Sequence, residues 1–179
     1  MAERRVTLYI ASSFDGYISG PNGELDWLPT GEGEGDEDYG YHEFYDSIDT
    51  VFMGRTTYKQ VLSFDVPYPY TGKTSYVFTR SAEVEKDEHS TFVSEDISSF
   101  IERIQKSPGK DIWLNGGGQL VTAFMDAGLI DEIVLTIIPI VLGEGIPLLD
   151  KLERRVGLKL IEAKSYDSGF VQLHYEVVR

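Results

Sequence analysis

Residues 111–142 read DIWLNGGGQLVTAFMDAGLIDEIVLTIIPIVL, and this stretch decides the fold. A short apolar run at 112–114 is followed by three glycines, after which apolar residues recur at helical spacing over 120–125. Gly128 stands where a left-handed helix C-cap is favoured, and 133–138 is a nearly all-apolar run. The stretch therefore predicts strand, glycine turn, helix and buried strand, a βαβ unit with a right-handed crossover in a parallel sheet.

The chemistry of this unit lies at its glycine turn. Glycines before a helix leave the N–H groups of the first turn uncovered, so a phosphate can approach backbone that carries partial positive charge. The turn also has a purely structural interpretation as a tight connection. The standard nucleotide-binding fingerprints are absent: G-x-G-x-x-G does not occur at this turn, and G-x-x-x-x-G-K-[ST] does not occur anywhere in the chain.

Composition limits the class of protein. With 179 residues and 41% hydrophobic content, we expect a single domain over 1–179. The chain has no cysteine, which excludes disulfides, thiol catalysis and thiolate metal sites, and its three histidines show no metal-ligand spacing. We therefore expect no metal site and a cytoplasmic location.

The net charge of -14 argues against nucleic acid and an anionic membrane surface as partners, because the mean field would repel both. The apolar run at 6–11 is too short for the core of a signal peptide, and no stretch approaches membrane-spanning length.

Charge is distributed unevenly along the chain. Glu24 to Asp49 holds ten acidic residues and neither lysine nor arginine, and its glycine-rich centre, Gly31 to Gly35, is predicted to be a mobile solvated loop. Between Met53 and Ser81 the local net charge is positive. This segment has one acidic residue, Asp65, and four basic residues, Arg55, Lys59, Lys73 and Arg80. This basic island suits an anionic ligand, although a chance run of exposed basic residues has the same composition.

The basic island also coincides with two predicted strand ends. Thr50–Met53 reads as a strand that leads through Arg55 into a helix from about Tyr58 to Leu62, and Thr79-Arg80-Ser81 ends a strand that begins at Thr74. Ligands of open α/β sheets gather at such carboxyl ends, and hydroxyls with a guanidinium suit a phosphate monoester.

The rest of the chain completes a mixed sheet with three or four helices. Apolar spacing predicts a helix over 97–104. Residues 139–147 are expected to be irregular, and alternation over 158–163 and 171–177 predicts an antiparallel hairpin.

Four segments together resemble the dihydrofolate reductase-like superfamily, and specifically the reductase of riboflavin biosynthesis, the C-terminal domain of the bifunctional deaminase-reductase. They are YIASSFDGYI at 9–18, VFMGRTTY at 51–58, LNGGGQ at 114–119 leading to GLIDE at 128–132, and PIVLGEG at 139–145. Their order and spacing agree over nearly the whole chain. The resemblance implies a mostly parallel central sheet flanked by helices, with a C-terminal antiparallel hairpin.

NADPH is the cofactor that the resemblance implies. Ala11 and Ile18 would flank the nicotinamide. The remaining cofactor-binding residues would hold the phosphates: Gly54, Arg55, Thr56 and Thr57 at a helix start, Thr79, Arg80 and Ser81 at the 2′-phosphate, and Gly116, Gly117, Gly118 and Gln119 at the pyrophosphate.

The resemblance implies fewer residues for the substrate site than for the cofactor site. The resemblance places Asp38 where folate enzymes keep a buried catalytic carboxylate, and Thr136 where a threonine hydrogen-bonds it. Asp38 has an alternative role as a helix cap near Tyr39. Trp27 and His42 would line the same cleft, although Trp27 also fits a core position. The acidic insertion at 31–35 departs from the family and disfavours folate, which is itself polyanionic.

The sequence thus favours a reductase that transfers a hydride from NADPH to a small organic substrate with a C=N or C=O group, similar to 5-amino-6-(5-phosphoribosylamino)uracil reductase. The alternatives are a catalytically inactive NADP(H)-binding protein, dihydrofolate reductase proper, and an acidic interaction module. A homodimer is the assembly that the resemblance implies.

Overall fold

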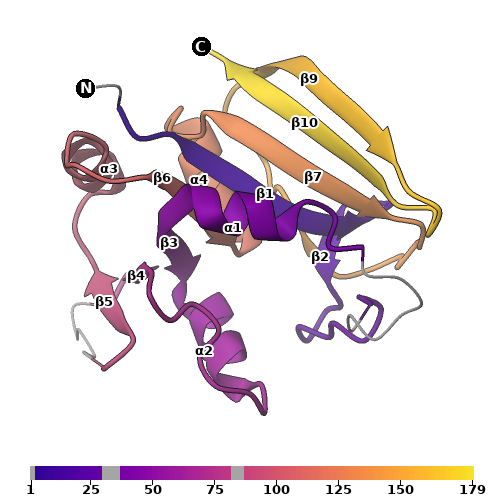
Figure 1. Ribbon diagram of the computed structural model, residues 1–179, viewed down its shortest axis with the longest axis horizontal. Coiled ribbons are helices and arrows are strands. Elements are labelled where there is room, and N and C mark those ends of the chain that lie inside the picture. Colours follow the sequence, from indigo (N-terminus) through magenta and orange to yellow (C-terminus); the bar gives the residue numbers. More distant parts are fainter. Residues whose placement is uncertain (1–2, 30–36, 82–86) are drawn as a thin grey trace.

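A computed structural model describes residues 3–29, 37–81 and 87–179 of the chain (Figure 1). The predicted loop at Gly31–Gly35 lies outside these residues. Four α-helices and ten strands occur in the described part. In chain order they are β1 (Val6–Ser13), β2 (Tyr17–Ser19), α1 (Tyr41–Ser47), β3 (Ile48–Gly54), α2 (Arg55–Ser63), β4 (Thr74–Phe78), β5 (Ser90–Val93), α3 (Ile97–Gln105), β6 (Asp111–Gly116), α4 (Gly118–Asp126), β7 (Glu132–Ile138), β8 (Ile146–Pro147), β9 (Gly157–Ser165) and β10 (Val171–Val178).

Eight of these strands form one sheet in the order β5-β4-β3-β6-β1-β7-β10-β9. Strands β5 to β7 in this order run parallel, whereas β10 is antiparallel to β7 and to β9. β2 and β8 form a separate two-stranded sheet. The predicted fold class, a mixed and mostly parallel sheet with a C-terminal antiparallel hairpin, is confirmed.

The strand, helix and strand predicted for residues 111–142 are present as β6, α4 and β7. β6 and β7 both lie beside β1 and run parallel to it, and α4 connects them. Gly128 follows the end of α4 with φ +68, a left-handed conformation that glycine adopts without steric cost.

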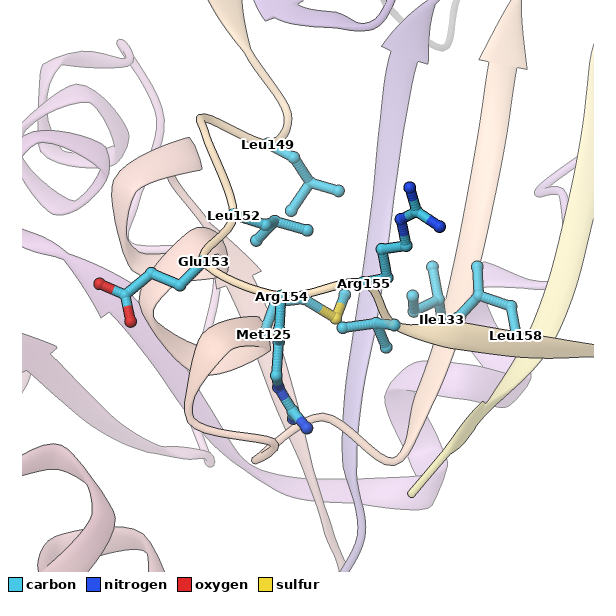
Figure 2. Close-up of a pocket in the computed structure, with 9 residues that line it drawn as sticks. Met125, Ile133, Leu149, Leu152, Glu153, Arg154, Arg155 and Leu158 are labelled. Carbon is cyan, nitrogen blue, oxygen red and sulfur yellow. The ribbon is translucent and has the colours of Figure 1, made fainter.

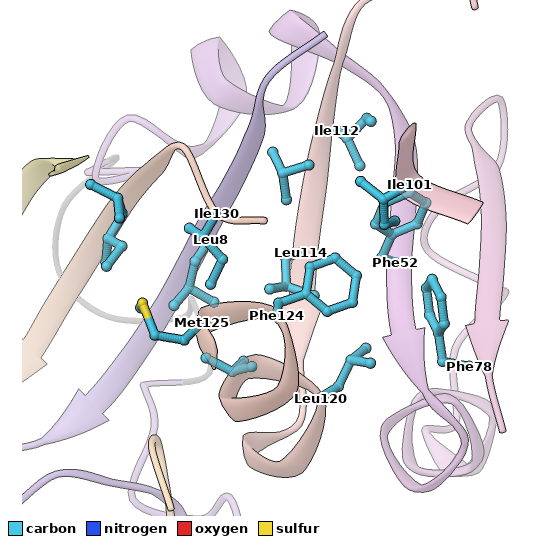
Figure 3. Packing of buried hydrophobic residues seen from close by; sticks show 14 of the residues in the cluster. Leu8, Phe52, Phe78, Ile101, Ile112, Leu114, Leu120, Phe124, Met125 and Ile130 are labelled. Carbon is cyan, nitrogen blue, oxygen red and sulfur yellow. The ribbon is translucent and has the colours of Figure 1, made fainter. Parts of the chain in front are cut away.

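Helices α3 and α4 pack the larger core against one face of the sheet. Phe52 is fully buried there, with the rings of Phe78, Phe100 and Phe124 centred 5.4–6.1 Å from its own (Figure 3). Strand residues at alternate positions, such as Leu8, Ile112 and Leu114, complete this core.

A second cluster fills the opposite face beneath α1 and α2. It is rich in aromatic rings, and Trp113 at its centre lies 5.3 Å from the ring of Tyr70 and 5.6 Å from that of Phe44. Tyr9 of β1 stacks on Phe44 at 4.3 Å. Helix α1 is thereby fixed across β1 and β6, and the segment that precedes it is brought over the sheet.

Three predicted boundaries were wrong. α2 begins at Arg55 and not near Tyr58, because Thr56 and Thr57 belong to its first turn. α1 begins at Tyr41 and not at Tyr39. The stretch 139–147 is not wholly irregular, since Ile146–Pro147 pairs with β2 as β8. No helix in the described residues is long and apolar enough to cross a membrane.

Candidate functional site

Two helix starts meet at the carboxyl ends of neighbouring strands. β3 ends at Gly54, where α2 begins, and β6 ends at Gly116, just before α4. A Cβ atom on Gly54 would lie 3.8 Å from the backbone nitrogen of Gly117, and one on Gly117 would lie 3.0 Å from Thr57 Oγ1. The Gly116–Gly117 peptide bond is cis. The two turns therefore lie against each other, and a side chain at Gly117 would crowd Thr57, whereas one at Gly54 would make only an ordinary contact.

Neither of these helices has a side-chain cap at its N-terminus. The N-cap residues are Gly54 and Gly117, and neither glycine has a side chain with which to cap the first-turn N–H groups of α2 or α4. Such N–H groups lack partners within the helix and carry the positive end of the helix dipole. Two adjacent starts of this kind form a backbone surface suited to a phosphate or pyrophosphate.

Gly118 holds the first turn of α4 against β8. A Cβ atom on Gly118 would overlap the carbonyl oxygen of Pro147, and its next neighbours would be backbone atoms of Pro147 and Leu148. Because β8 pairs with β2, this contact ties the glycine turn to Ile18, the residue predicted to lie beside the nicotinamide.

The basic island lies beside these turns. Phe78, the last residue of β4, is paired with Gly54, so Thr79, Arg80 and Ser81 emerge next to the start of α2. Thr79 Oγ1 accepts a hydrogen bond from the Ser81 backbone N–H at 3.1 Å, and Arg80 is exposed. Gln119 is exposed in the first turn of α4. The predicted phosphate-binding residues are thus brought together at the carboxyl ends of β4, β3 and β6.

Ala11 and Thr136 are direct neighbours across β1 and β7, and Gln172 of β10 lies beside Thr136 on the other side. Gln172 Nε2 donates hydrogen bonds to Thr136 Oγ1 and to the carbonyl oxygen of Tyr39, both at 3.0 Å. Since Thr136 Oγ1 accepts from Gln172, its own proton is available to another acceptor.

Tyr39 is held in an unusual conformation. It is the one non-glycine residue with positive φ in the described part of the chain, at φ 54. Its carbonyl oxygen accepts from Tyr9 Oη at 2.9 Å as well as from Gln172. Its ring stacks on Phe170 and meets Tyr166 edge-on, with centroids 4.8 Å away in both cases. Burial raises the pKa of Tyr9 to about 12, so this hydroxyl remains a donor.

Asp38 lies one residue before Tyr39 and three residues before the first residue of α1. Its carboxylate accepts from the backbone N–H groups of His42 at 2.9 Å and Gly40 at 3.0 Å, and it contacts His42 Nδ1 at 2.6 Å. These backbone hydrogen bonds, with the help of His42, lower the pKa of Asp38 to about 2. The hydrogen bond from the His42 N–H reaches the first turn of α1, so Asp38 helps to cap this helix from outside it, while the N-cap position itself is Gly40. No hydrogen bond joins Asp38 to Thr136 among the residues described, and the catalytic role of both stays a prediction.

Trp27, the other predicted substrate residue, is partly buried. Its Nε1 donates to the carbonyl oxygen of Glu24 at 3.2 Å. His42 is exposed on α1 and is directed to Asp38. The structure therefore brings His42 and Asp38 together, and no hydrogen bond or ring contact joins either of them to Trp27 in the described residues.

The family model for the RibD C-terminal domain matches residues 4–172 of this sequence. The chain belongs to the RibD C-terminal domain family. Two relatives in Bacillus subtilis (strain 168) are themselves uncharacterized: YwjB is 46% identical over 173 residues, 97% of this chain and 98% of that protein, and YyaP is 36% identical over 98% and 96%.

Solved structures of RibD-related proteins share the fold of this RibD C-terminal domain. A putative riboflavin biosynthesis protein from Shewanella sp. PV-4 has a TM-score of 0.89 and 30% identity, with 98% of this chain and 99% of that chain covered. The deaminase/reductase of Thermotoga maritima has a TM-score of 0.74 and 18% identity over 98% of this chain and 57% of that chain. Dihydrofolate reductase of Enterococcus faecalis, complexed with NADP(H), has a TM-score of 0.70 and 16% identity over 98% and 97%.

Three residues that the hydrogen bonds around Thr136 connect were not among the predicted site residues of this RibD C-terminal domain: Tyr9, Tyr39 and Gln172. Gln172 is one polar position in an alternating strand, and only the pairing of β10 with β7 places it beside Thr136. The alternation of β10 could have identified its face, but nothing local indicated its partners.

The pH dependence of stability tests the state of the Asp38 carboxyl. Because its folded pKa is lowered, Asp38 should stabilise the protein fully above pH about 4, with the contribution lost as pH falls toward 2. We expect the difference in Tm between wild type and Asp38→Asn to be constant from pH 5 to 7 and to vanish near pH 2. Asp65→Asn, on the exposed surface after α2, controls for loss of a carboxylate. A carboxyl resonance of Asp38 that titrates above pH 5 would contradict the capping role.

Proposed function

We propose that this RibD C-terminal domain, acting as one domain over residues 1–179, is an NADPH-dependent reductase that transfers a hydride to a C=N or C=O group of a small organic substrate. The observation that carries the proposal is the pair of abutting, uncapped helix starts at Gly54 and Gly117, with the basic island beside them. The pyrophosphate group of a dinucleotide has the charge and size that this backbone surface accepts.

The residues present fit that cofactor. No Cβ atom covers the backbone of Gly116, Gly117 and Gly118, and Thr57 Oγ1 lies beside the turn at Gly117. Arg55 and Arg80 would hold the phosphates by charge-assisted hydrogen bonds. Thr79 and Ser81 would bind the 2′-phosphate, and Thr56 and Gln119 would border the pyrophosphate. The bound cofactor would supply the hydride, and the NADP(H) complex of the dihydrofolate reductase supports this assignment.

The chain's own residues would orient the acceptor and exclude water. Ala11 and Ile18 would flank the nicotinamide, with Thr136 on the same sheet face as Ala11. The Thr136 hydroxyl would donate a hydrogen bond to a substrate oxygen or nitrogen, because its oxygen already accepts a hydrogen bond from Gln172. Asp38, Trp27 and His42 would border the substrate. The Thermotoga deaminase/reductase makes 5-amino-6-(5-phosphoribosylamino)uracil reductase chemistry the first activity to assay.

A second candidate is an NADP(H)-binding protein without turnover. Reduction of a C=N group requires a proton as well as a hydride, and the lowered pKa of Asp38 makes it a weak source of one at neutral pH. The candidates differ in whether NADPH is consumed. The absorbance of NADPH reports this in assays with 5-amino-6-(5-phosphoribosylamino)uracil and, separately, with dihydrofolate.

Cofactor binding is tested by titration with NADPH and, separately, NADH, followed by tryptophan fluorescence. We expect micromolar binding of NADPH and weaker binding of NADH. Arg55→Ala and Arg80→Ala should each lose roughly 1–3 kcal/mol of NADPH binding, because each removes a charged hydrogen-bond donor to phosphate. Arg5→Ala is the matched control, since Arg5 precedes β1 and lies at the opposite end of the strands. Failure of both nucleotides to bind would remove the reductase proposal.

We also propose a homodimer as the assembly of this protein. The resemblance to the riboflavin reductase implies it.

A further inference from the structure

The ends of β1 and β7, next to the proposed substrate site, carry apolar side chains that solvent reaches. Phe14, which follows β1, is 74% exposed, and Val141, three residues after β7, is 66% exposed. The Phe14 backbone N–H donates to the carbonyl oxygen of Ile140 at 2.8 Å, so the two segments lie side by side. They give the site an apolar border.

Aromatic rings form a second border. β9 is antiparallel to β10, which is antiparallel to β7, so the chain leaves β9 at the same end of the sheet. Tyr166 lies there, and its ring meets that of Tyr39 edge-on at 4.8 Å, with both residues partly exposed. Gln172 ties Tyr39 to Thr136. Partly exposed rings beside a hydroxyl that can donate favour a flat ligand with a hydrogen-bond acceptor.

The charged residues in the connections at this end of the sheet are acidic. Residues 9–49, 132–147 and 165–178, which include β2, α1, β7 and β10, hold neither lysine nor arginine. Lys164, one residue before the end of β9, has its Nζ over the ring of Tyr166, 4.8 Å from the centroid. The acidic residues described in these connections are Asp15, Glu37, Asp38, Glu144 and Asp167. Their summed field repels an anionic ligand.

The start of α1 does not offset this charge. The backbone N–H groups of Gly40 and His42 donate to the Asp38 carboxylate at 3.0 and 2.9 Å, and His42 Nδ1 contacts the same carboxylate at 2.6 Å. With its pKa lowered to about 2, this carboxyl is ionised at neutral pH. A substrate phosphate would therefore meet a negative charge where a helix start usually attracts anions.

Basic residues near β7 lie at the opposite end of that strand. Arg5 and Arg179 pair with acidic residues at or next to its start. Arg154 and Arg155 flank a hollow of about 460 Å³ that Ile133, the second residue of β7, also lines (Figure 2). The carboxyl end of β7 is five residues beyond Ile133, about 17 Å along the strand. This is twice the roughly 8 Å over which physiological salt screens a charge.

The basic island is separated from the substrate site by whole strands. In the order β4-β3-β6-β1-β7, three strand spacings, about 14 Å, separate β7 from β3, which leads to Arg55. Four spacings, about 19 Å, separate β7 from β4, which leads to Arg80. In the proposed function both arginines hold cofactor phosphates. A phosphate on the substrate would be far from either of them.

We propose that the substrate of this reductase is a flat nitrogen heterocycle that is uncharged or cationic at neutral pH and carries neither phosphate nor carboxylate. This inference rests on the proposed function and names the substrate class of the same site. The hydride of NADPH would pass to the carbon of the C=N or C=O group, leaving NADP⁺, and the nitrogen or oxygen would take a proton from water. The acidic border selects against anionic analogues of the same ring.

Equilibrium dialysis at low ionic strength, with and without NADP⁺, measures binding in the absence of turnover. Two pairs of probes share a ring system and differ in an anionic group: 5-amino-6-(ribosylamino)uracil against 5-amino-6-(5-phosphoribosylamino)uracil, and dihydrobiopterin against dihydrofolate. The uncharged member of at least one pair should bind, and it should bind at least about tenfold more tightly than its anionic counterpart, because like charges oppose the latter.

Charge-reversal variants test the cause of this preference. Glu144→Lys and Asp167→Lys each place a cation in an exposed connection at the acidic end. Each should lower the affinity ratio at least about threefold, chiefly by tighter binding of the anionic compound. Glu153→Lys makes the same change in charge beside the hollow at the opposite end, and it should leave the ratio unchanged. A wild-type ratio in both border variants would overturn the inference.

The dialysis alone can also overturn it. A ratio below about tenfold in a pair that binds, or no binding of any of the four compounds, would contradict the proposed substrate class. Tighter binding of the uncharged compound without NADPH consumption would leave the ligand class standing and remove the reductase function. NADPH consumption with a preference for the phosphate ester would do the reverse.

Discussion

Gly118→Ala is expected to lower the free energy of unfolding by about 3 kcal/mol, at the upper end of the usual cost of overpacking. The added methyl group would overlap the Pro147 carbonyl oxygen, and a backbone atom of a paired strand cannot rotate away as a side chain would. Either α4 or β8 must shift, and the shift would displace the glycine turn at the proposed cofactor site. Urea denaturation measures the loss, and the NADPH titration should show weaker binding by the same variant.

Gly157→Ala is the matched control for this substitution. Its Cβ atom would meet Val178 at 3.5 Å, an ordinary contact, so we expect a change within about 0.5 kcal/mol. Equal denaturation midpoints for Gly118→Ala and Gly157→Ala would show that the contact between α4 and β8 does not constrain the turn.

Phe52→Ala should have the largest effect on stability, about 3–5 kcal/mol. Phe52 is fully buried in the middle of β3, and its ring contacts aromatic rings from α3, α4 and β4. Its removal leaves a cavity bordered by elements from both halves of the chain. Thermal and urea unfolding of Phe52→Ala and wild type give the difference.

Phe14→Ala deletes the same atoms at a position that is 74% exposed, and it should unfold within about 0.5 kcal/mol of wild type. A Phe52→Ala protein that loses less than about 1 kcal/mol would mean that the core collapses around the deleted ring, contrary to the rigid packing expected of a folded interior.

The sheet was predictable because its strands carry their own pattern. The parallel strands are apolar on both faces, and the hairpin alternates, so residues 111–142 and 158–177 each indicated the correct element. The start of α2 was not predictable in this way. Gly54 supplies no capping side chain, and Thr56 and Thr57 are poor helix formers, so the helical pattern appeared only from Tyr58 onward.

In the site, too, local features were predictable from the sequence and contacts between distant residues were not. The glycine turns and the basic island are local features, and the structure brings them to one edge of the sheet. The bonds of Gln172 to Thr136 and Tyr39 join residues 36 and 133 positions apart, so no local pattern could reveal them. The alternative between catalysis and capping at Asp38 depended on hydrogen bonds to the backbone, which the sequence does not record.

The strand order has a consequence for how the chain folds during synthesis. β1 lies inside the sheet, yet its neighbours are β6 and β7, with Val6 paired to Ile112 and Thr7 to Glu132. Contacts between such distant residues slow folding, because a long loop must close before they form. β1 is therefore made before the other strands described here but is completed among the last, and its apolar residues must remain unpaired until β6 and β7 have been made.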